Sequence, residues 1–493
     1  MSLIKCPVLC GGIALQLNGD NTLLFNPLRT FQAIGLLAVS LALSACQTYE
    51  PRPLNFEAHR DAWRGRLADD VAVAVFVQNL QAQGALEADR FDVADGLTLL
   101  EAELITLVFN PDLRLVRLRA GVADATAKHA GLWDDPKFAI NLLRILEDIS
   151  TPWVIAPSLS VTLPISGRLK AEKARANAAA KVALTRVAEA EWSARHDLRK
   201  AWWTWSALSL RLNETRRLLD TLVTLVEATS QLAKAGELPR TEAALFVIEE
   251  ARLQQAARRL KAEHISTEYR LRALLGLSPD ASLTLHAVLS AANRPSLATA
   301  DVLAAQNLTL ARLKDAYNVA EQVLLREVRK QYPDITIGSL YESDEGQSRI
   351  GFTGGIPLPI FNANRQGIAE ANAQRELARA AYETAYERLV GLLAQSLAQV
   401  DAHQEQREEM ERVLVPMIDQ QLQDARQMIV LGEGGGLVLL ESLVRAYEIK
   451  LELIDIRLNE ALSVSQVQQL LGPQVLQSTP AQSAVDDGHE VKP

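Results

Sequence analysis

The sequence has little of what most enzymes and nucleic-acid-binding proteins require. Only 7 of its 493 residues are histidine, 4 are methionine and 3 are cysteine. The histidines are scattered and form no spacing typical of a zinc site. The chain contains no phosphate-binding loop, no Gly-x-Ser-x-Gly turn and no dinucleotide fingerprint. The net charge of −9 does not favour a nucleic-acid partner. We therefore expect no catalytic residues, no metal site and no enzymatic activity.

Aromatic residues are also scarce, at 5%, whereas 48% of the chain is hydrophobic. Alanine, leucine, glutamate, arginine and glutamine dominate, a composition suited to long helices. Residues 167–236 include no proline and no interior glycine, which allows roughly 100 Å of helix at 1.5 Å per residue. Residues 367–432 form a similar run, in which we expect interruptions at Gly391 and Pro416. Helices of this length must pair in a coiled coil or bundle to bury an apolar stripe.

The N-terminal region contains a short apolar run. Arg29 precedes residues 33–45, which are too few to span a membrane and are typical of a signal peptide. Leu43-Ser44-Ala45-Cys46 resembles the bacterial lipobox, so 1–45 would be a removed signal peptide and Cys46 a lipidated N-terminus. This covalent lipid is the only cofactor that we expect. By resemblance to lipoproteins, Gln47 favours the outer membrane. The alternative is an ordinary signal peptide beside an incidental cysteine.

The chain also repeats itself. Five landmarks recur in the same order, with offsets of 195 to 197 residues. The pairs are Asn110 and Asn307, Pro136 and Pro333, Leu163–Ile165 and Leu358–Ile360, Gly236–Glu237 and Gly432–Glu433, and Leu274–Gly276 and Leu470–Gly472. They predict a first structural repeat over 46–290, a linker over 291–300 and a second repeat over 301–473. The tail over 474–493 has no periodicity, and we expect it to be disordered.

Each repeat shows the same order of elements. A helix (95–131 or 300–331) is followed by two strands (136–165 or 333–360), a long helix (167–236 or 366–431) and a return helix (240–276 or 437–472). Apolar and polar residues alternate along the strands, as where Ile335 and Ile337 lie on one face and Thr336 and Gly338 on the other. The strand near 136–147 alternates poorly. Four strands are too few to close a barrel. Either the sheet is a small soluble cap, or three chains pool twelve strands, an even number in the range of outer-membrane barrels.

One stretch carries a family resemblance. Residues 355–383, "GIPLPIFNANRQGIAEANAQRELARAAYE", resemble the strand-to-helix junction of the TolC-type outer-membrane efflux family, in its acylated branch. Residues 161–180 match the same junction more loosely. The resemblance covers essentially the whole chain after Cys46. It implies a mainly α fold with a long antiparallel coiled-coil α-barrel. Four strands per chain would contribute to a trimeric, twelve-stranded membrane β-barrel.

The resemblance also implies a function and partners. The chain would be a homotrimeric, passive conduit of a tripartite export system for drugs, metals or other small molecules. It would be lipid-anchored in the outer membrane, with a large periplasmic portion. Its partners would be a periplasmic adaptor (membrane fusion protein) and an inner-membrane pump of the resistance-nodulation-division type. The alternative is a structural coiled-coil outer-membrane lipoprotein without a pore.

Three groups of residues are candidate sites by this resemblance. The first is the barrel-to-tunnel junction, where prolines end strand pairing, Asn362 or Asn364 caps a helix, and Gly367 permits close packing. Its residues are Pro164, Pro357, Pro359, Asn362 and Gly367.

The second group is the pair of periplasmic helix tips, which would contact the adaptor or simply reverse the chain. Its residues are Gly236, Glu237, Gly432, Glu433 and Gly434. The third is Glu441, which would constrict the entrance as an acidic ring or would be an ordinary exposed glutamate.

Overall fold

The computed structural model describes residues 49–84, 91–93, 95–146, 152–289, 295, 298–344, 347–431 and 435–473. The expected signal peptide, Cys46, most of the linker, Gly432–Gly434 and the tail lie outside these residues. The chain divides into two units, Met1–Arg60 and Asp61–Pro493. Helix α2 (Phe56–Arg64) begins in the first unit.

The first repeat contains one unbroken helix of 68 residues, α6 (Arg168–Ala235). Its ends are set by Gly167 and Gly236, which adopt left-handed φ values of 75° and 81° that glycine tolerates. At Gly236 the Glu237 N–H donates to Leu232 O at 3.0 Å, a Schellman C-cap. Helix α7 (Arg240–Leu274) then returns along α6. The predicted pair of long antiparallel helices is present.

The second repeat interrupts its long helix once. Helix α10 (Arg365–Glu409) is followed by the π-helix η1 (Met410–Leu414), α11 (Val415–Leu431) and the return helix α12 (Gly436–Leu471). Helix α10 continues through Gly391, so the expected interruption there was wrong, since one glycine costs only about 1 kcal/mol. The π turn stands just before Pro416, which lacks an N–H. A π turn contains one more residue than an α turn. This extra residue matches the growth of the repeat offset from 195 at the strand ends to 196 at the tips.

The helix that precedes each strand pair is also broken, contrary to prediction. The elements are α4 (Leu99–Phe109) and α5 (Pro111–Lys128) in one repeat, and α8 (Ala300–Gln306) and α9 (Leu308–Arg329) in the other. The breaks fall at Asn110 and Asn307, whose extended backbones start a new helix. Their side chains cap it, accepting from Leu113 N at 3.2 Å and Leu310 N at 2.9 Å.

The same two asparagines bind the end of the return helix in each repeat. Asn110 Nδ2 donates to Leu274 O at 3.0 Å, and Asn307 Nδ2 donates to Leu470 O at 2.7 Å. The following glycine has a positive φ in both cases. A Cβ added at Gly276 would lie 2.1 Å from Phe109 O, and one added at Gly472 would lie 2.3 Å from Gln306 O. Two landmark pairs thus form the same contact twice, which confirms the internal duplication.

The four strands form one antiparallel sheet in the order β1-β2-β3-β4. They are β1 (Lys137–Arg144), β2 (Trp153–Leu163), β3 (Ile335–Asp344) and β4 (Gln347–Gly355). Strand β4 ends at Gly355, short of the predicted 360, because Pro357 and Pro359 cannot donate to a ladder. Strands β2 and β3 pair across the repeats, with Val161 opposite Ile337.

The sheet register separates an apolar from a polar face. One row joins Phe138, Leu159, Ser339 and Phe352 across all four strands. On the other face, Thr162 and Thr336 lie opposite each other, with their Oγ1 atoms 3.3 Å apart. The phenylalanines are exposed, Phe352 by 89%. The apolar face is therefore not covered within the chain at these positions.

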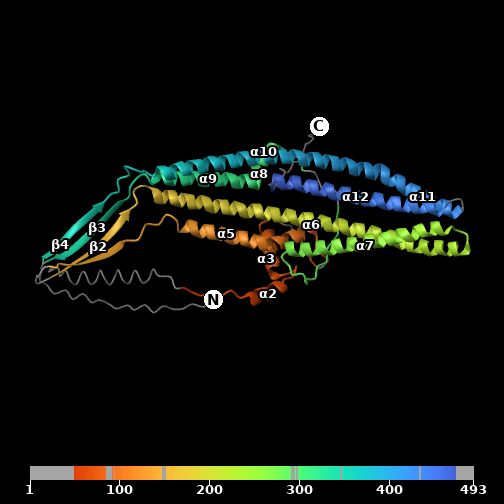
Figure 1. The fold of residues 1–493 in the computed structure, drawn as a ribbon, viewed down its shortest axis with the longest axis horizontal. Helices are drawn as coiled ribbons and strands as arrows, with labels where there is room; N and C mark the ends of the chain where they lie inside the picture. Colours follow the sequence, from red (N-terminus) through yellow and green to blue (C-terminus); the bar gives the residue numbers. More distant parts are fainter. Residues whose placement is uncertain are drawn as a thin grey trace, which may run out of the picture. The chain divides into compact units, whose positions relative to one another are not determined.

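The long helices lie side by side, with the sheet at one end (Figure 1). Helix α6 packs against α5, α7, α9 and α12, while α10 packs against α9 and α12. One core cluster surrounds the buried Trp202 and includes residues of α3 (Val71–Ala82), α4 and α7. A second, around Phe246, joins the two helical hairpins near their ends. Among the described residues, no helix is both long enough and apolar enough to cross a bilayer.

Candidate functional site

The joint between sheet and helices has the same backbone turn in both repeats. Ile165 N donates to Leu163 O, and Ile360 N donates to Leu358 O, each at 2.9 Å. These three-residue γ-turns centre on Pro164 and Pro359, whose fixed φ suits the turn. Pro164 therefore redirects the chain directly after β2, and Pro359 does so four residues after the end of β4.

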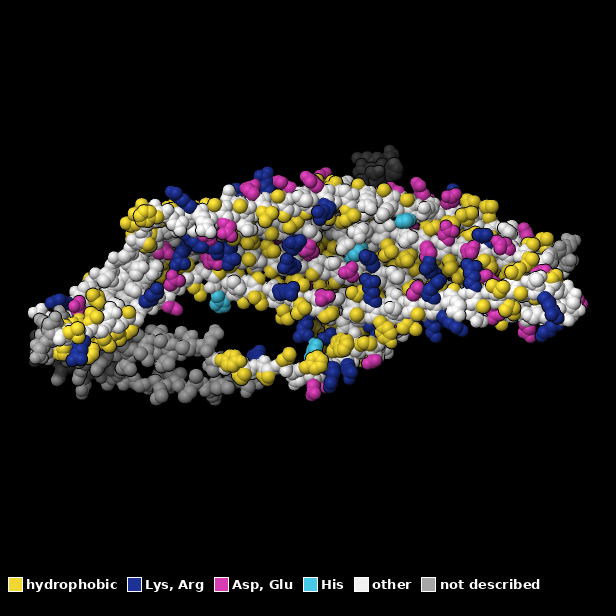
Figure 2. Space-filling model, viewed as in Figure 1, with side chains coloured by type: hydrophobic (Ala, Val, Ile, Leu, Met, Phe, Trp, Pro, Cys, Tyr) yellow, Lys and Arg dark blue, Asp and Glu magenta, His cyan; other side chains and the backbone are white. Residues whose placement is uncertain are grey.

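In the first repeat, the joint is held by ion pairs. Arg168, the first residue of α6, donates through Nε to Asp334 Oδ2 at 2.5 Å and through Nη2 to Asp134 Oδ2 at 2.8 Å. Asp334 also accepts from Ser166 N at 3.2 Å. Because Asp334 directly precedes β3, this network ties the first repeat to the second. Charged side chains of both signs gather where the helices meet the sheet (Figure 2).

In the second repeat, the joint is built around Glu327. Asn364 Nδ2 donates to Glu327 O and to Glu327 Oε2, both at 2.9 Å. Burial opposes the charge of Glu327, but hydrogen bonds from Lys330, Asn364 and Arg326 lower its pKa to about 2. A Cβ added at Gly367 would lie 2.7 Å from Asn364 Oδ1 and 2.9 Å from Glu327 Oε2. Gly367 is thus packed closely against Asn364 and Glu327.

The expected helix cap at this joint was wrong. Asn364 occupies the N-cap position with a left-handed φ of 53°, but its side chain makes no capping bond and instead binds Glu327. Asn362 contributes its main-chain carbonyl, which accepts from Arg365 N at 2.9 Å. A capping bond would need Asn364 Oδ1 to accept from a backbone N–H, but the two bonds that Nδ2 donates to Glu327 turn the side chain toward α9 instead.

At the tips, the structure places only part of the predicted site. Gly236 and Glu237 are exposed and form the turn between α6 and α7. Gly432, Glu433 and Gly434 lie outside the described residues. Gly436 begins α12, and a Cβ there would lie 3.4 Å from both Glu242 Oε1 and Phe246. The start of α12 is therefore packed against the start of α7.

Glu441 lies on the exposed face of α12 and is not a lone carboxylate. Arg445 Nη2 lies 3.1 Å from Glu441 Oε1, and Arg445 Nη1 lies 3.2 Å from Glu448 Oε2. Val438, one turn nearer the tip, is also exposed. A ring of Glu441 side chains would thus be partly neutralised by Arg445.

Two polar contacts link the hairpins beside these groups. Arg211 of α6 forms an ion pair with Asp455 of α12. One turn closer to the tips, Thr215 Oγ1 lies 3.0 Å from the Tyr447 hydroxyl. These residues and the Arg168 and Glu327 networks were not predicted, because charges on long helices are usually solvated. The available signal was the position of two of them at element boundaries, since Asp334 directly precedes β3 and Arg168 begins α6.

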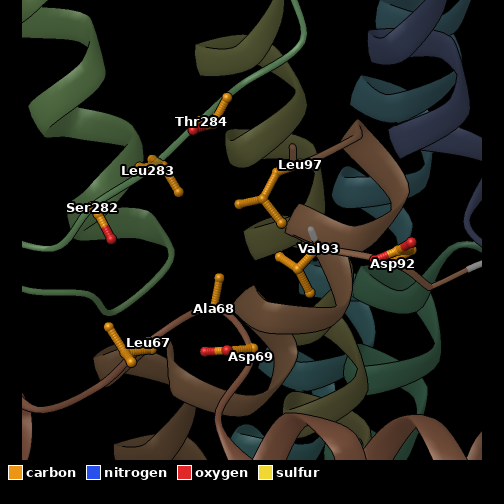
Figure 3. Close-up of a pocket in the computed structure, with 9 residues that line it drawn as sticks. All are labelled: Leu67, Ala68, Asp69, Asp92, Val93, Leu97, Ser282, Leu283 and Thr284. Atoms are coloured by element: carbon orange, nitrogen blue, oxygen red, sulfur yellow. The ribbon is translucent and has the colours of Figure 1, made fainter. Parts of the chain in front are cut away.

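The second unit also contains a pocket of about 420 Å³ between residues 67–69, residues 92, 93 and 97, and residues 282–284. It is lined by Leu67, Ala68, Asp69, Asp92, Val93, Leu97, Ser282, Leu283 and Thr284. Its walls are polar and apolar in about equal parts. Asp92 points away from Leu67 and Leu283 (Figure 3). Within the described ranges, no three His, Cys, Asp or Glu side chains are placed to hold a metal ion. The pocket has no convergent set of reactive groups.

Comparisons with known proteins identify the fold. No protein-family model matches the chain, and no curated protein matches it. The outer membrane protein VceC of Vibrio cholerae aligns with a TM-score of 0.65 and 17% identity, over 76% of this chain and 96% of VceC. CusC, studied for transmembrane channel formation, aligns at 0.67 and 14%, over 87% of this chain and 100% of CusC. The CmeC outer membrane channel of Campylobacter jejuni aligns at 0.66 and 14%, over 77% and 86%.

At these identities the alignments show the fold alone. The chain has the fold of TolC-type outer-membrane efflux channels, with long antiparallel helices and a four-stranded sheet. None of these three neighbours is described as an enzyme. The fold predicted from the sequence is confirmed.

Proposed function

We propose that the chain is the outer-membrane channel of a tripartite export system and acts as a passive homotrimeric conduit. The observation that carries this proposal is the sheet. It has one exposed apolar face, one polar face, and β1 and β4 at its edges. An open sheet cannot stand in lipid, but three copies would close twelve strands with apolar residues outward. The fold of VceC, CusC and CmeC supports this assembly.

In this proposal the long helices form a tunnel that continues the pore. The tips at Gly236–Glu237 and Gly432–Gly434 meet a periplasmic adaptor, which couples the tunnel to an inner-membrane pump. Glu441 lines the entrance together with Arg445, so the entrance attracts cations less strongly than a ring of unpaired glutamates would. Cys46 carries the lipid that anchors each copy. The cargo is drugs, metals or other small molecules, and the pump selects among them.

The pore-free alternative, a structural coiled-coil lipoprotein, is not favoured. Such a spacer gains nothing from a sheet with exposed Phe138, Ile350 and Phe352 on one face. Apolar patches of this kind mark surfaces that meet lipid or protein.

Planar-bilayer recording tests the channel. We expect low conductance from the wild type and frequent openings from Asp455→Asn with Tyr447→Phe, which removes the Arg211–Asp455 and Thr215–Tyr447 contacts between α6 and α12. Asp419→Asn is the control, because Asp419 pairs with Lys450 inside one hairpin at 3.6 Å. It should behave as the wild type. Absence of conductance from every variant, in protein shown to be monomeric, would refute the proposal.

A further inference from the structure

Two helices at opposite edges of the second unit leave apolar faces uncovered. On α5, Leu115, Leu118 and Val122 are 53%, 59% and 68% exposed. Their spacing of three and four residues places them on one helix face. On α10, Leu377 is 65% exposed and lies among alanines. Helix α5 packs on α6, whereas α10 packs on α9 and α12 (Figure 1).

The internal repeat indicates what covers these faces. Helix α9 is the counterpart of α5, since Asn307 and Asn110 cap them in the same way. Helix α10 is the counterpart of α6. Within the chain, α6 of the first repeat packs along α9 of the second. The equivalent contact, between α10 and α5, does not form inside the chain because these helices lie at opposite edges. A second copy would supply it.

The contacts between α6 and α9 also give the register. Asp315 of α9 binds Lys181 at 2.8 Å and Thr185 at 2.7 Å. Subtracting the offset of 197 from Asp315 of α9 gives its counterpart on α5, Leu118. Adding the offset of 195 to Lys181 and Thr185 of α6 gives their counterparts on α10, Glu376 and Ala380. Arg312 of α9 and Glu189 of α6 form an ion pair at 2.6 Å. By the same offsets, their counterparts are Leu115 of α5 and Thr384 of α10.

The counterpart residues on α5 and α10 are exposed. Glu376, Ala380 and Thr384 all lie on the uncovered face of α10. Buried positions support the offset independently, because Ala176, Leu198 and Ala201 of α6 correspond to the buried Ala371, Leu393 and Ser396 of α10. Leu377 then falls between Leu118 and Val122.

We infer that α5 of one copy packs against α10 of the next in this register, and we name the contact of Leu115, Leu118 and Val122 with residues 376–384 the inter-copy seam. Its chemistry differs from that of the equivalent contact inside the chain. Ion pairs at Asp315 and Arg312 are replaced by leucines, so assembly gains from removing apolar area from water. The inference rests on the proposed trimer and adds its interface and register.

Matched cysteine pairs test the seam in the full-length, membrane-extracted protein with Cys6 and Cys10 replaced by serine. Under mild oxidation, Leu118→Cys with Ala380→Cys should form covalent dimers and trimers. The equivalent pair inside the chain, Thr185→Cys with Asp315→Cys, should crosslink without changing the chain count. Each single variant shows whether Cys46 takes part.

A charge substitution gives a second readout. Leu118→Glu should lower the trimer fraction at a fixed protein concentration by about tenfold or more. Leu184→Glu is the control, since Leu184 is 63% exposed but lies on α6, away from both edges. Trimers that resist Leu118→Glu and do not crosslink through residues 118 and 380 would overturn the seam and leave the channel standing. Protein that is monomeric without any substitution would overturn both.

Discussion

The two repeats build the same framework from different residues. Both break a helix at an asparagine that binds a leucine carbonyl, and both leave the sheet through a Leu-Pro-Ile γ-turn. They differ at the joint, where Arg168 binds two aspartates in one repeat and Asn364 binds Glu327 in the other. They also differ along the long helix, which is continuous in α6 and has a π turn in the second repeat.

This difference separates what the architecture requires from what it tolerates. The shared contacts bring main-chain atoms close together, where only one residue type fits. The differing contacts involve long side chains that can be exchanged as long as the joint stays closed. Substitutions at shared positions should therefore cost more than those at differing ones, and by similar amounts in the two repeats.

The largest effects are expected at the paired glycines. Gly276→Ala and Gly472→Ala place a Cβ against a carbonyl oxygen at a positive φ, and each should cost about 3 kcal/mol or more. Gly121→Ala is the control, because nothing lies within 4 Å of its added Cβ. Urea unfolding followed by tryptophan fluorescence measures all three. Tolerance of alanine at only one of the two positions would break the equivalence of the repeats.

The paired asparagines come next. Asn110→Ala and Asn307→Ala each remove a helix cap and leave a leucine carbonyl without its donor. We expect each to lose about 2 kcal/mol by urea unfolding. Asn372→Ala, at an exposed site on α10, should change stability by less than about 0.5 kcal/mol. A loss at Asn110 as small as that of Asn372 would contradict a shared structural role.

A smaller, pH-dependent effect is expected at Glu327. Glu327→Gln should cost about 1.5 kcal/mol at neutral pH, because the buried carboxylate loses its charged hydrogen bonds while Gln keeps one acceptor oxygen. The pKa of Glu327 is about 2 in the folded chain, below its usual 4.5. Its stabilisation is therefore complete above about pH 4.5 and is lost as pH falls toward 2. Stability curves of wild type and variant should converge over that window. A stability difference between wild type and Glu327→Gln that stays constant with pH would show that the charge does not matter. Glu383 is the control, because its exposed ion pair with Arg379, at 2.9 Å, contributes little to stability, so Glu383→Gln should stay close to the wild type.

The smallest effect concerns the long helix. Gly391→Ala should stabilise the protein by about 0.5–1 kcal/mol, since α10 is regular there and the added Cβ meets nothing within 4 Å. Thermal unfolding monitored by circular dichroism measures the gain. Destabilisation would instead show that Gly391 serves a bend, as the sequence alone suggested.

Much of the framework could be predicted because it follows from local patterns. The absence of proline between 167 and 236 gives α6, and alternating residues give β2, β3 and β4. Strand β1 was poorly predicted because Leu142 and Leu143 blur its alternation. The breaks at Asn110 and Asn307 were missed even though both residues were landmarks, because their contacts to Leu274 and Leu470 lie more than 160 residues away in sequence.

The candidate site was less predictable. The prolines and Gly367 were found because backbone geometry limits the residue type. Glu327 and Asp334 were not, because a carboxylate becomes structural only when the fold brings amides and arginines to it. The inter-copy seam could be inferred only from sequence and structure together. The internal repeat is visible in the sequence, whereas the uncovered helix faces are visible only in the structure.

The number of copies tests the central claim most directly. Native mass spectrometry of the detergent-extracted protein should give three times the mass of the lipidated chain, with the trimer lost on heating. A particle with the mass of a single chain, under conditions where the sheet is intact by circular dichroism, would contradict the account.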